Sequence, residues 1–170
     1  IPLLTAMAVL LSRNRQQVRW ISLSGSLIQL ILSFVLFFSF RNERALGNNT
    51  QMLFEQIYPL FASWNINFHL GVDGISVAMI LLTSFVLIAG VLVSWNIEKM
   101  TKEFYFLLLL LALGAYGFFI SLDLFVLFFF LEISVIPKYL LIGIWGSGRK
   151  EYSANKLALM LMGGSALILV

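Results

Sequence analysis

Apolar runs of about twenty residues dominate the sequence and constrain its fold more than any other feature. A helix needs about 20 such residues to cross the roughly 30 Å hydrocarbon core of a bilayer. We predict full or partial spans at 1–11, 20–40, 75–95, 104–122, 124–146 and 153–170. Only 11% of the chain is charged, against about 25% in soluble domains. The predicted fold class is an all-α, polytopic transmembrane helix bundle of about six helices.

Both ends of this bundle are expected to belong to a longer protein. Residues 1–11 are too short to span a membrane, and no basic segment precedes them. They are therefore interpreted as the tail of a helix rather than as a signal peptide. The last predicted helix is still apolar at Val170. Between the second and third spans we expect a loop at 41–68, with a short surface segment at 51–62.

The basic residues predict the orientation of the helices. Loops 12–19, 96–103 and 147–156 hold three, two and three Lys and Arg residues, whereas the opposite side holds Arg41 and Arg44. The three loops share one side if the spans alternate, and the positive-inside rule makes that side cytoplasmic. The net charge of +3 is thus a topology signal, and no nucleic-acid partner is predicted.

Several small and polar residues predict helix ends and helix contacts. The stretch from Ser121 to Asp123 is the expected tight turn between two antiparallel spans, with Asp123 as a cap. The stretch from Gly71 to Gly74 predicts a turn and a helix start. Two stripes of small residues predict close helix packing. The stripes are Ser76, Thr83, Gly90 and Ser94 on one helix, and Gly114, Gly117 and Ser121 on another.

The sequence has few residues that could bind a redox cofactor. The chain has no cysteine and one histidine, which excludes thiolate-bound iron–sulfur clusters and bis-histidine haem within it. His69 is followed by Asp73, but a lone histidine is seldom a metal site. We therefore predict no cofactor, no metal and no redox centre in this chain.

Glu132 is the main candidate functional residue, because it lies near the middle of the span at 124–146. Two central charges cost roughly 5–7 kcal/mol of insertion free energy. That cost offsets most of the roughly 5–9 kcal/mol contributed by the fifteen Leu, Ile, Phe and Val residues of the span. The residues three and four positions from Glu132 are apolar, so we expect it to be protonated or to have a partner on another helix.

A carboxyl group in this position can serve proton transfer. Burial disfavours its charged form and a nearby lysine favours it, so a balanced group can take up and release a proton near neutral pH. Acids inside membranes are functional by default. The alternative is a permanently neutral Glu132 that is hydrogen-bonded to a hydroxyl or carbonyl group.

Two lysines are further candidates for proton transfer. Lys138 lies about 240° around the helix and ~9 Å along it from Glu132, on the face of Ser134, so it is not expected to face the acid. Its alternative role is an interfacial lysine that snorkels toward the cytoplasm. Pro137 removes one helical hydrogen bond next to the acid, which suits a hydrated site. Lys156 opens the last helix, and its alternative role is also interfacial.

Three stretches resemble a known family: FHLGVDGISVAMILLT (68–83), FFFLEISVIPKYLLIGIWG (128–146) and YSANKLALMLMGGSALILV (152–170). They are similar to the antiporter-like subunits of the proton-translocating NADH–quinone oxidoreductases, respiratory complex I. The Glu-x-x-x-x-Pro spacing and the Trp-Gly end resemble subunit M, or chain 4, more than its paralogues L and N. The resemblance covers about 68–170; residues before it fit only in helix count and loop length.

The resemblance implies a fourteen-helix antiporter-like fold with two inverted five-helix repeats. Residues 1–103 would be N-terminal transmembrane helices with the outer loop at 41–68, and 104–170 the start of the first repeat. Glu132 would be the glutamate of the fifth helix, which in the family pairs with a lysine on a broken seventh helix. Lys138 stands where relatives are expected to have a neutral residue, which leaves open whether Glu132 has a single lysine partner.

The predicted function is that of a proton-translocating membrane subunit of NADH–quinone oxidoreductase. Electron transfer in other subunits would drive H⁺ through a buried Glu/Lys axis formed by Glu132, Lys138 and Lys156. The expected partners are other membrane subunits of a respiratory complex, the lipid bilayer and protons, and the expected location is the bacterial inner membrane. The alternatives are a Na⁺/H⁺ antiporter or membrane-bound hydrogenase subunit of the same family, or a non-transporting membrane scaffold.

Overall fold

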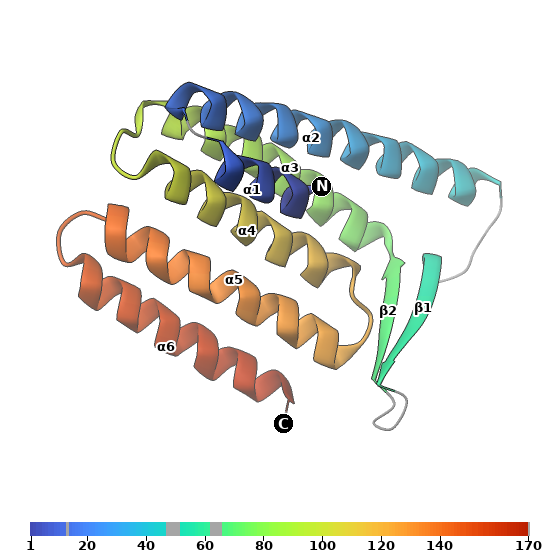
Figure 1. Cartoon of the computed structure of the whole chain (residues 1–170). Coiled ribbons are helices and arrows are strands. Elements are labelled where there is room, and N and C mark those ends of the chain that lie inside the picture. Colours follow the sequence, from blue (N-terminus) through green and yellow to red (C-terminus); the bar gives the residue numbers. More distant parts are fainter. Residues whose placement is uncertain (13, 47–51, 62–65, 170) are drawn as a thin grey trace.

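Six α-helices and one β-hairpin make up the described part of the chain (Figure 1). The structure, a computed structural model, describes residues 1–12, 14–46, 52–61 and 66–169. The elements are α1 (Pro2–Leu11), α2 (Arg15–Ala45), β1 (Leu53–Phe61), β2 (Ile66–Val72), α3 (Gly74–Val93), the 3₁₀ helix η2 (Ser94–Asn96), α4 (Thr101–Ile120), α5 (Leu124–Trp145) and α6 (Lys150–Leu169). The predicted helical bundle is confirmed, and α2 extends beyond its predicted span at both ends.

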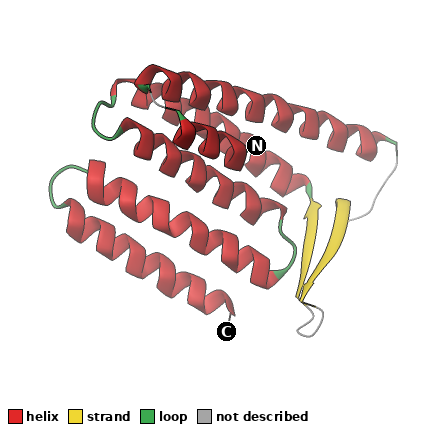
Figure 2. Cartoon of the chain, in the orientation of Figure 1, coloured by secondary structure: helices red, strands yellow, loops and turns green. Residues whose placement is uncertain are grey.

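The hairpin replaces most of the loop that was predicted at 41–68. Strands β1 and β2 pair antiparallel, with Leu53 opposite Val72 and Gln56 opposite Leu70. The hairpin lies at one end of the bundle, beside the turn between α4 and α5 (Figure 2). The amide of Leu122 in that turn donates to the carbonyl of His69, at 2.9 Å. The hairpin is therefore joined to the helices through backbone hydrogen bonds.

The long helices follow one another in antiparallel order, and each packs against the next (Figure 1). The short helix α1 packs against α2 and α4. Helices α2, α4 and α5, and α3 continued through Asn96, are long and apolar enough to cross a membrane. Large apolar side chains such as Leu82, Val86 and Ile136 are exposed on them. The chain is a multi-pass membrane protein, and these side chains lie on the surface of the described helices.

Gly114 allows the closest contact between α4 and α5. A Cβ atom at this position would lie 2.8 Å from the Ser134 Cβ and 2.9 Å from the Phe130 carbonyl oxygen. Such distances leave no room for a side chain. The close packing predicted for this stripe is thus confirmed at Gly114. At Gly90 of the other predicted stripe, an added Cβ would meet Leu108 only at 3.7 Å, so α3 and α4 make ordinary contact there.

Buried hydroxyl groups join α2, α3 and α4. The Ser84 hydroxyl is hydrogen-bonded to Ser33 of α2 and to the Tyr116 hydroxyl of α4, at 2.8 Å. All three side chains are buried. Polar side chains that bond across helices stabilise membrane bundles where apolar contact gives no preference over lipid. This cluster was not predicted from the sequence.

Asp73 and Asp123 begin α3 and α5, as predicted. The Asp73 carboxylate accepts from the amide of Ser76 at 2.7 Å, and the Asp123 carboxylate accepts from the amide of Phe125 at 2.9 Å. Each satisfies amide groups that have no partner within the first turn of a helix. Hydrogen bonds from Ser76, first from its side chain and then from its amide, hold the pKa of Asp73 below its usual value of 3.8.

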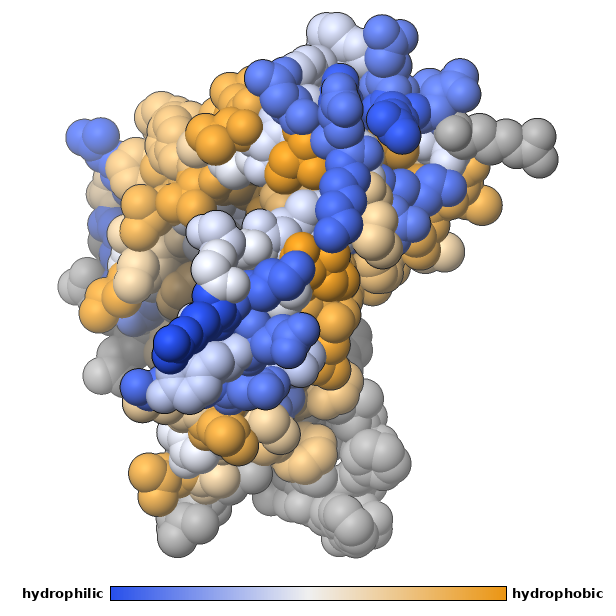
Figure 3. All heavy atoms as spheres, turned by 90° about the vertical axis from the view of Figure 1, so that its left-hand side faces the viewer, coloured by the Kyte–Doolittle hydropathy of each residue, from blue (hydrophilic) through white to orange (hydrophobic). Residues whose placement is uncertain are grey.

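The basic loops gather at the end of the bundle opposite to the hairpin. The connections α1–α2, α3–α4 and α5–α6 lie at this end (Figure 1). Viewed from there, hydrophilic residues cluster over the loops while apolar residues surround them (Figure 3). Hydrogen bonds tie the loops to neighbouring helix ends: Lys102 Nζ donates to the Leu10 carbonyl at 3.0 Å, and Trp145 Nε1 donates to that of Lys99 at 2.9 Å. The grouping that the topology prediction requires is therefore present.

Candidate functional site around Glu132 and Lys138

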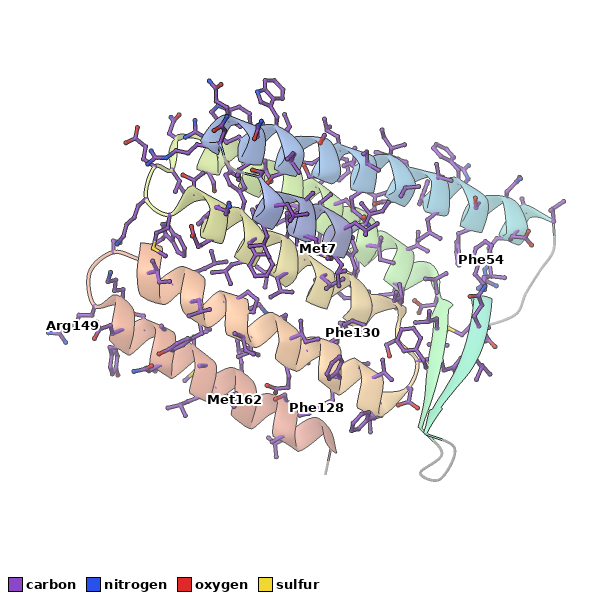
Figure 4. All side chains as sticks on the ribbon, viewed as in Figure 1. Met7, Phe54, Phe128, Phe130, Arg149 and Met162 are labelled. Atoms are coloured by element: carbon purple, nitrogen blue, oxygen red, sulfur yellow. The ribbon has the colours of Figure 1, made fainter. Side chains whose placement is uncertain are left out.

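Glu132 contacts a hydroxyl group on the neighbouring helix α6. The Ser165 hydroxyl is hydrogen-bonded to Glu132 Oε1, and it also lies 3.0 Å from the carbonyl oxygen of Met162. Ser165 is only 2% exposed and Glu132 is half-buried. Figure 4 labels Phe128 and Met162, which precede these two residues by about one turn on α5 and α6. Glu132 therefore has a partner on another helix, which is one of the two alternatives predicted from its apolar surroundings.

Lys138 lies on a different side of α5 from Glu132. Its Nζ donates to Ser134 Oγ at 3.4 Å, and the Ser134 side chain faces Gly114 of α4. The expectation that Lys138 shares a face with Ser134 and not with Glu132 is confirmed. Ser134 is one turn further from the basic end of the bundle than Lys138 is. The amine therefore extends away from the nearer interface, which is the opposite of snorkelling.

A cavity of about 510 Å³ lies beside Lys138. Residues of α3, α4 and α5 line it, together with Leu161 of α6. Nearly all of these residues are apolar, and its polar side chains are Thr83, Ser134 and Lys138. An ammonium group beside apolar side chains favours an anionic or hydrogen-bonding neighbour.

The structure does not bring all three predicted proton-transfer residues together. Lys156 is exposed, and its Nζ lies over the ring of Tyr152, 6.0 Å from the centroid. Among the described residues, no ion pair joins Glu132 to Lys138 or to Lys156. Pro137 is buried within α5, which continues through it as a helix. The role of these residues in proton transfer remains a prediction.

Ser165 is the site residue that sequence reasoning missed. It follows Gly163 and Gly164, a run of small residues that indicates helix packing rather than a specific partner. The available signal was its position on the next predicted span along the chain, which runs opposite to the Glu132 helix if the spans alternate. Which serine meets the acid depends on how the two helices are rotated, and the pattern of small residues does not determine that rotation.

His69 lies in the hairpin, away from Glu132. Its Nε2 is 3.8 Å from the Glu55 carboxylate, and both side chains are partly exposed. In the part of the chain that the structure describes, no three His, Cys, Asp or Glu residues are grouped closely enough to hold a metal ion.

Known proteins similar to this chain are subunits of quinone oxidoreductases. NAD(P)H-quinone oxidoreductase chain 4 of the Angiopteris evecta chloroplast is 36% identical over 154 residues, which is 90% of this chain and 30% of that protein. NADH-quinone oxidoreductase subunit M of Buchnera aphidicola is 38% identical over 135 residues, 78% of this chain and 27% of that protein. The chain belongs to the family of chain 4 and subunit M proteins. It spans about 30% of the length of these relatives.

The family likeness extends over the whole chain in another relative. NAD(P)H-quinone oxidoreductase chain 4 2 of Thermosynechococcus vestitus is 34% identical over 172 residues, covering 100% of this chain and 32% of that protein. No family model matches the chain. Membership in the chain 4 and subunit M family thus rests on similarity to individual proteins, and it includes the N-terminal part in which the sequence motifs are weakest.

The fold also matches a solved membrane complex. A chain of the membrane-bound sulfane sulfur reductase, an archaeal respiratory membrane complex, superposes with a TM-score of 0.74 over 97% of this chain and 33% of its own length. The two sequences are 21% identical. This likeness shows a shared arrangement of helices.

Proposed function

We propose that the chain is part of a proton-translocating subunit of an NADH–quinone oxidoreductase, and that Glu132 carries the proton. The observation that carries this proposal is the half-buried acid near the middle of α5, with Ser165 of α6 as its hydrogen-bond partner. An ionisable group at this depth costs about 3 kcal/mol of insertion free energy. A residue that only packs helices would not need to carry that cost.

The chain supplies the path for the proton and not the redox chemistry. Its relatives are subunits of quinone oxidoreductases, so electron transfer in partner subunits would supply the driving force. The work assigned to this chain is vectorial proton transfer, in which Glu132 takes up a proton from one side and releases it toward the other. Lys138 would stabilise a negatively charged group in the adjoining cavity. Lys156 would lie near the end of the proton path that is surrounded by the basic loops.

Residues 104–170 are proposed to begin the first inverted repeat, preceded by the N-terminal helices and the hairpin in 1–103. The proposed location is the bacterial inner membrane. Relatives from chloroplasts as well as bacteria make a chloroplast membrane the alternative.

The test of the proposed function is Glu132→Gln in the assembled oxidoreductase. Glutamine keeps the shape and the hydrogen bonds of a protonated glutamate but cannot ionise. A hydroxyl partner such as Ser165 can form a hydrogen bond with a permanently neutral carboxyl group as well as with one that ionises. Loss of proton translocation with intact assembly would support the ionising role, and full translocation would support the neutral one.

A further inference from the structure

Ser165 is fixed at the contact between α5 and α6. It and Ala154 are 2% and 1% exposed, and their separation of eleven positions corresponds to about three turns on one face of the helix. An ideal Cβ on Gly143 of α5 would be 3.9 Å from the Ala154 Cβ, so this face packs against α5. Its neighbours Met162 and Leu167 are exposed. The hydroxyl group of Ser165 is therefore held where the two helices meet.

This hydroxyl group has two neighbours and one hydrogen. Ser165 Oγ is hydrogen-bonded to Glu132 Oε1 and lies 3.0 Å from the Met162 carbonyl oxygen. A serine hydroxyl donates one hydrogen bond and accepts others, whereas a carbonyl oxygen only accepts. A carboxylate also only accepts, but a protonated carboxyl group can donate. The hydrogen of Ser165 thus has a different best acceptor in each protonation state of Glu132.

We propose that Ser165 is a positioning residue for Glu132, and that the hydrogen bond between them reverses its direction as Glu132 gains and loses a proton. When Glu132 is ionised, Ser165 donates its hydrogen to the carboxylate. When Glu132 is protonated, the carboxyl group donates to Ser165 Oγ, and the hydrogen of Ser165 turns to the Met162 carbonyl. The inference rests on the proposed function, because it requires Glu132 to change its protonation state.

The reversal keeps every group satisfied without moving the backbone. Both protonation states retain the contact between Glu132 and Ser165, and only the hydroxyl hydrogen rotates. An unsatisfied polar group in an apolar site costs about 1–3 kcal/mol, so a site that satisfies both states lowers the cost of passing between them. A helix contact that served packing alone would need no hydroxyl group here.

Other charged and titratable groups near this contact are few in the described part of the chain. Helices α4 and α6 pack against α5. On α5 itself, Lys138 is bonded to Ser134. On α6, Lys156 lies over Tyr152, nine residues before Ser165. On α4, the Tyr116 hydroxyl is bonded to Ser84 of α3. Within the described residues, Ser165 is therefore the polar side chain that contacts Glu132.

The direction of the influence of Ser165 on Glu132 follows from charge. A hydrogen bond donated to a carboxylate is about twice as strong as one between neutral groups, so loss of the hydroxyl harms the ionised form more. Ser165→Ala should therefore shift the protonation of Glu132 to higher pH. The carboxyl C=O stretch of protonated Glu132 should move to higher frequency, because its hydrogen bond is lost.

The experiment is infrared difference spectroscopy on the assembled oxidoreductase over a pH titration. The band that disappears in Glu132→Gln is assigned to Glu132. Ser165→Ala should shift both the band and its midpoint, and Ser165→Cys, a weaker donor of similar size, should shift both by less. Ser153→Ala changes an exposed serine of the same helix and should shift neither. If Ser165→Ala does not assemble, Ser165→Cys carries the test.

Unchanged band and midpoint in the Ser165 variants would overturn the proposal. A downward shift of the midpoint would do so as well, since it would mean that the hydroxyl favours the protonated form. The proposed function is tested separately. It would be wrong if Glu132→Gln retained full proton translocation. The spectroscopic result does not depend on translocation, so the two failures can be told apart.

Discussion

Glu132 and Lys138 lie six residues apart on α5, yet they have different partners: Glu132 meets Ser165 of α6, and Lys138 Nζ meets Ser134 Oγ at 3.4 Å. The acid and the amine therefore do not neutralise each other within this chain. Each is available to a group elsewhere in a longer protein or in a partner subunit. The relatives are roughly three times as long as this chain.

Lys138→Met tests whether the amine contributes to transport. We expect better insertion, because a central lysine costs about 3 kcal/mol, together with proton translocation that is several-fold slower. The reason is that Lys138 is the cationic group on the wall of an otherwise mostly apolar cavity. Membrane yield and acidification would be measured on the same preparations.

Lys99→Met is the matched control, because Lys99 is an exposed lysine in the connection between α3 and α4. A similar loss in both variants would indicate a general effect of charge. Unchanged translocation in Lys138→Met would return Lys138 to the interfacial role.

The starts of α3 and α5 could be predicted well because their causes are local. Asp123 follows a polar turn and precedes an apolar run, and it begins α5 as expected. The sides of α5 on which Glu132 and Lys138 lie also follow from helical geometry within one element. The hairpin could not be predicted in the same way, because Leu53 and Val72 pair across nineteen residues and strand pairing is not local.

The contacts of the site were harder to predict than its residues. Glu132 stands out in an apolar run, whereas Ser165 is one of several small polar residues in the helices. Which of them approaches Glu132 is decided by helix rotation and by close packing such as that at Gly114. The same reason explains why the Ser33, Ser84 and Tyr116 cluster was missed.

The orientation of the bundle can be tested at the two ends of one helix. Asn14 precedes α2 and Asn42 lies in its last turn, about 42 Å apart along the helix axis, and both are exposed. We expect Asn14→Cys to label from the cytoplasmic side and Asn42→Cys from the opposite side, because the basic loops lie at the Asn14 end. Asn49, another suitable position by sequence, lies outside the described residues. Labelling of both cysteines from one side would contradict the alternating arrangement.

Gly114→Ala should weaken the contact between α4 and α5. The added methyl group would lie 2.9 Å from the Phe130 carbonyl oxygen, and overpacking of this kind costs about 1–3 kcal/mol. Gly164→Ala is the control, since an added Cβ there meets nothing within 4 Å. We expect it to be neutral or slightly stabilising, because alanine favours a helix by about 0.5–1 kcal/mol. The free energy of unfolding in detergent micelles measures both, and equal effects would argue against close packing at Gly114.

The cap of α3 should make stability depend on pH. Because the pKa of Asp73 is lowered in the folded state, its contribution is present above the unfolded pKa of about 3.8 and is lost as the pH falls through the lower folded value. Asp73→Ala should cost about 1 kcal/mol at neutral pH and should remove this part of the pH dependence. The free energy of unfolding of the two proteins would be measured from about pH 6 down to about pH 3 and compared. If the variant loses as much stability in acid as the unchanged protein does, a group other than Asp73 causes the pH dependence.

Glu132→Gln in the assembled oxidoreductase is the most direct test of the proton-carrying role. Assembly, NADH oxidation and acidification are measured in the same membranes, with Glu132→Asp as the matched variant that keeps an ionisable group at shorter reach. We predict that Glu132→Gln assembles but loses most proton translocation and part of its NADH oxidation, while Glu132→Asp keeps partial activity. Full translocation by an assembled Glu132→Gln protein would show that Glu132 is structural and would contradict the proposed mechanism.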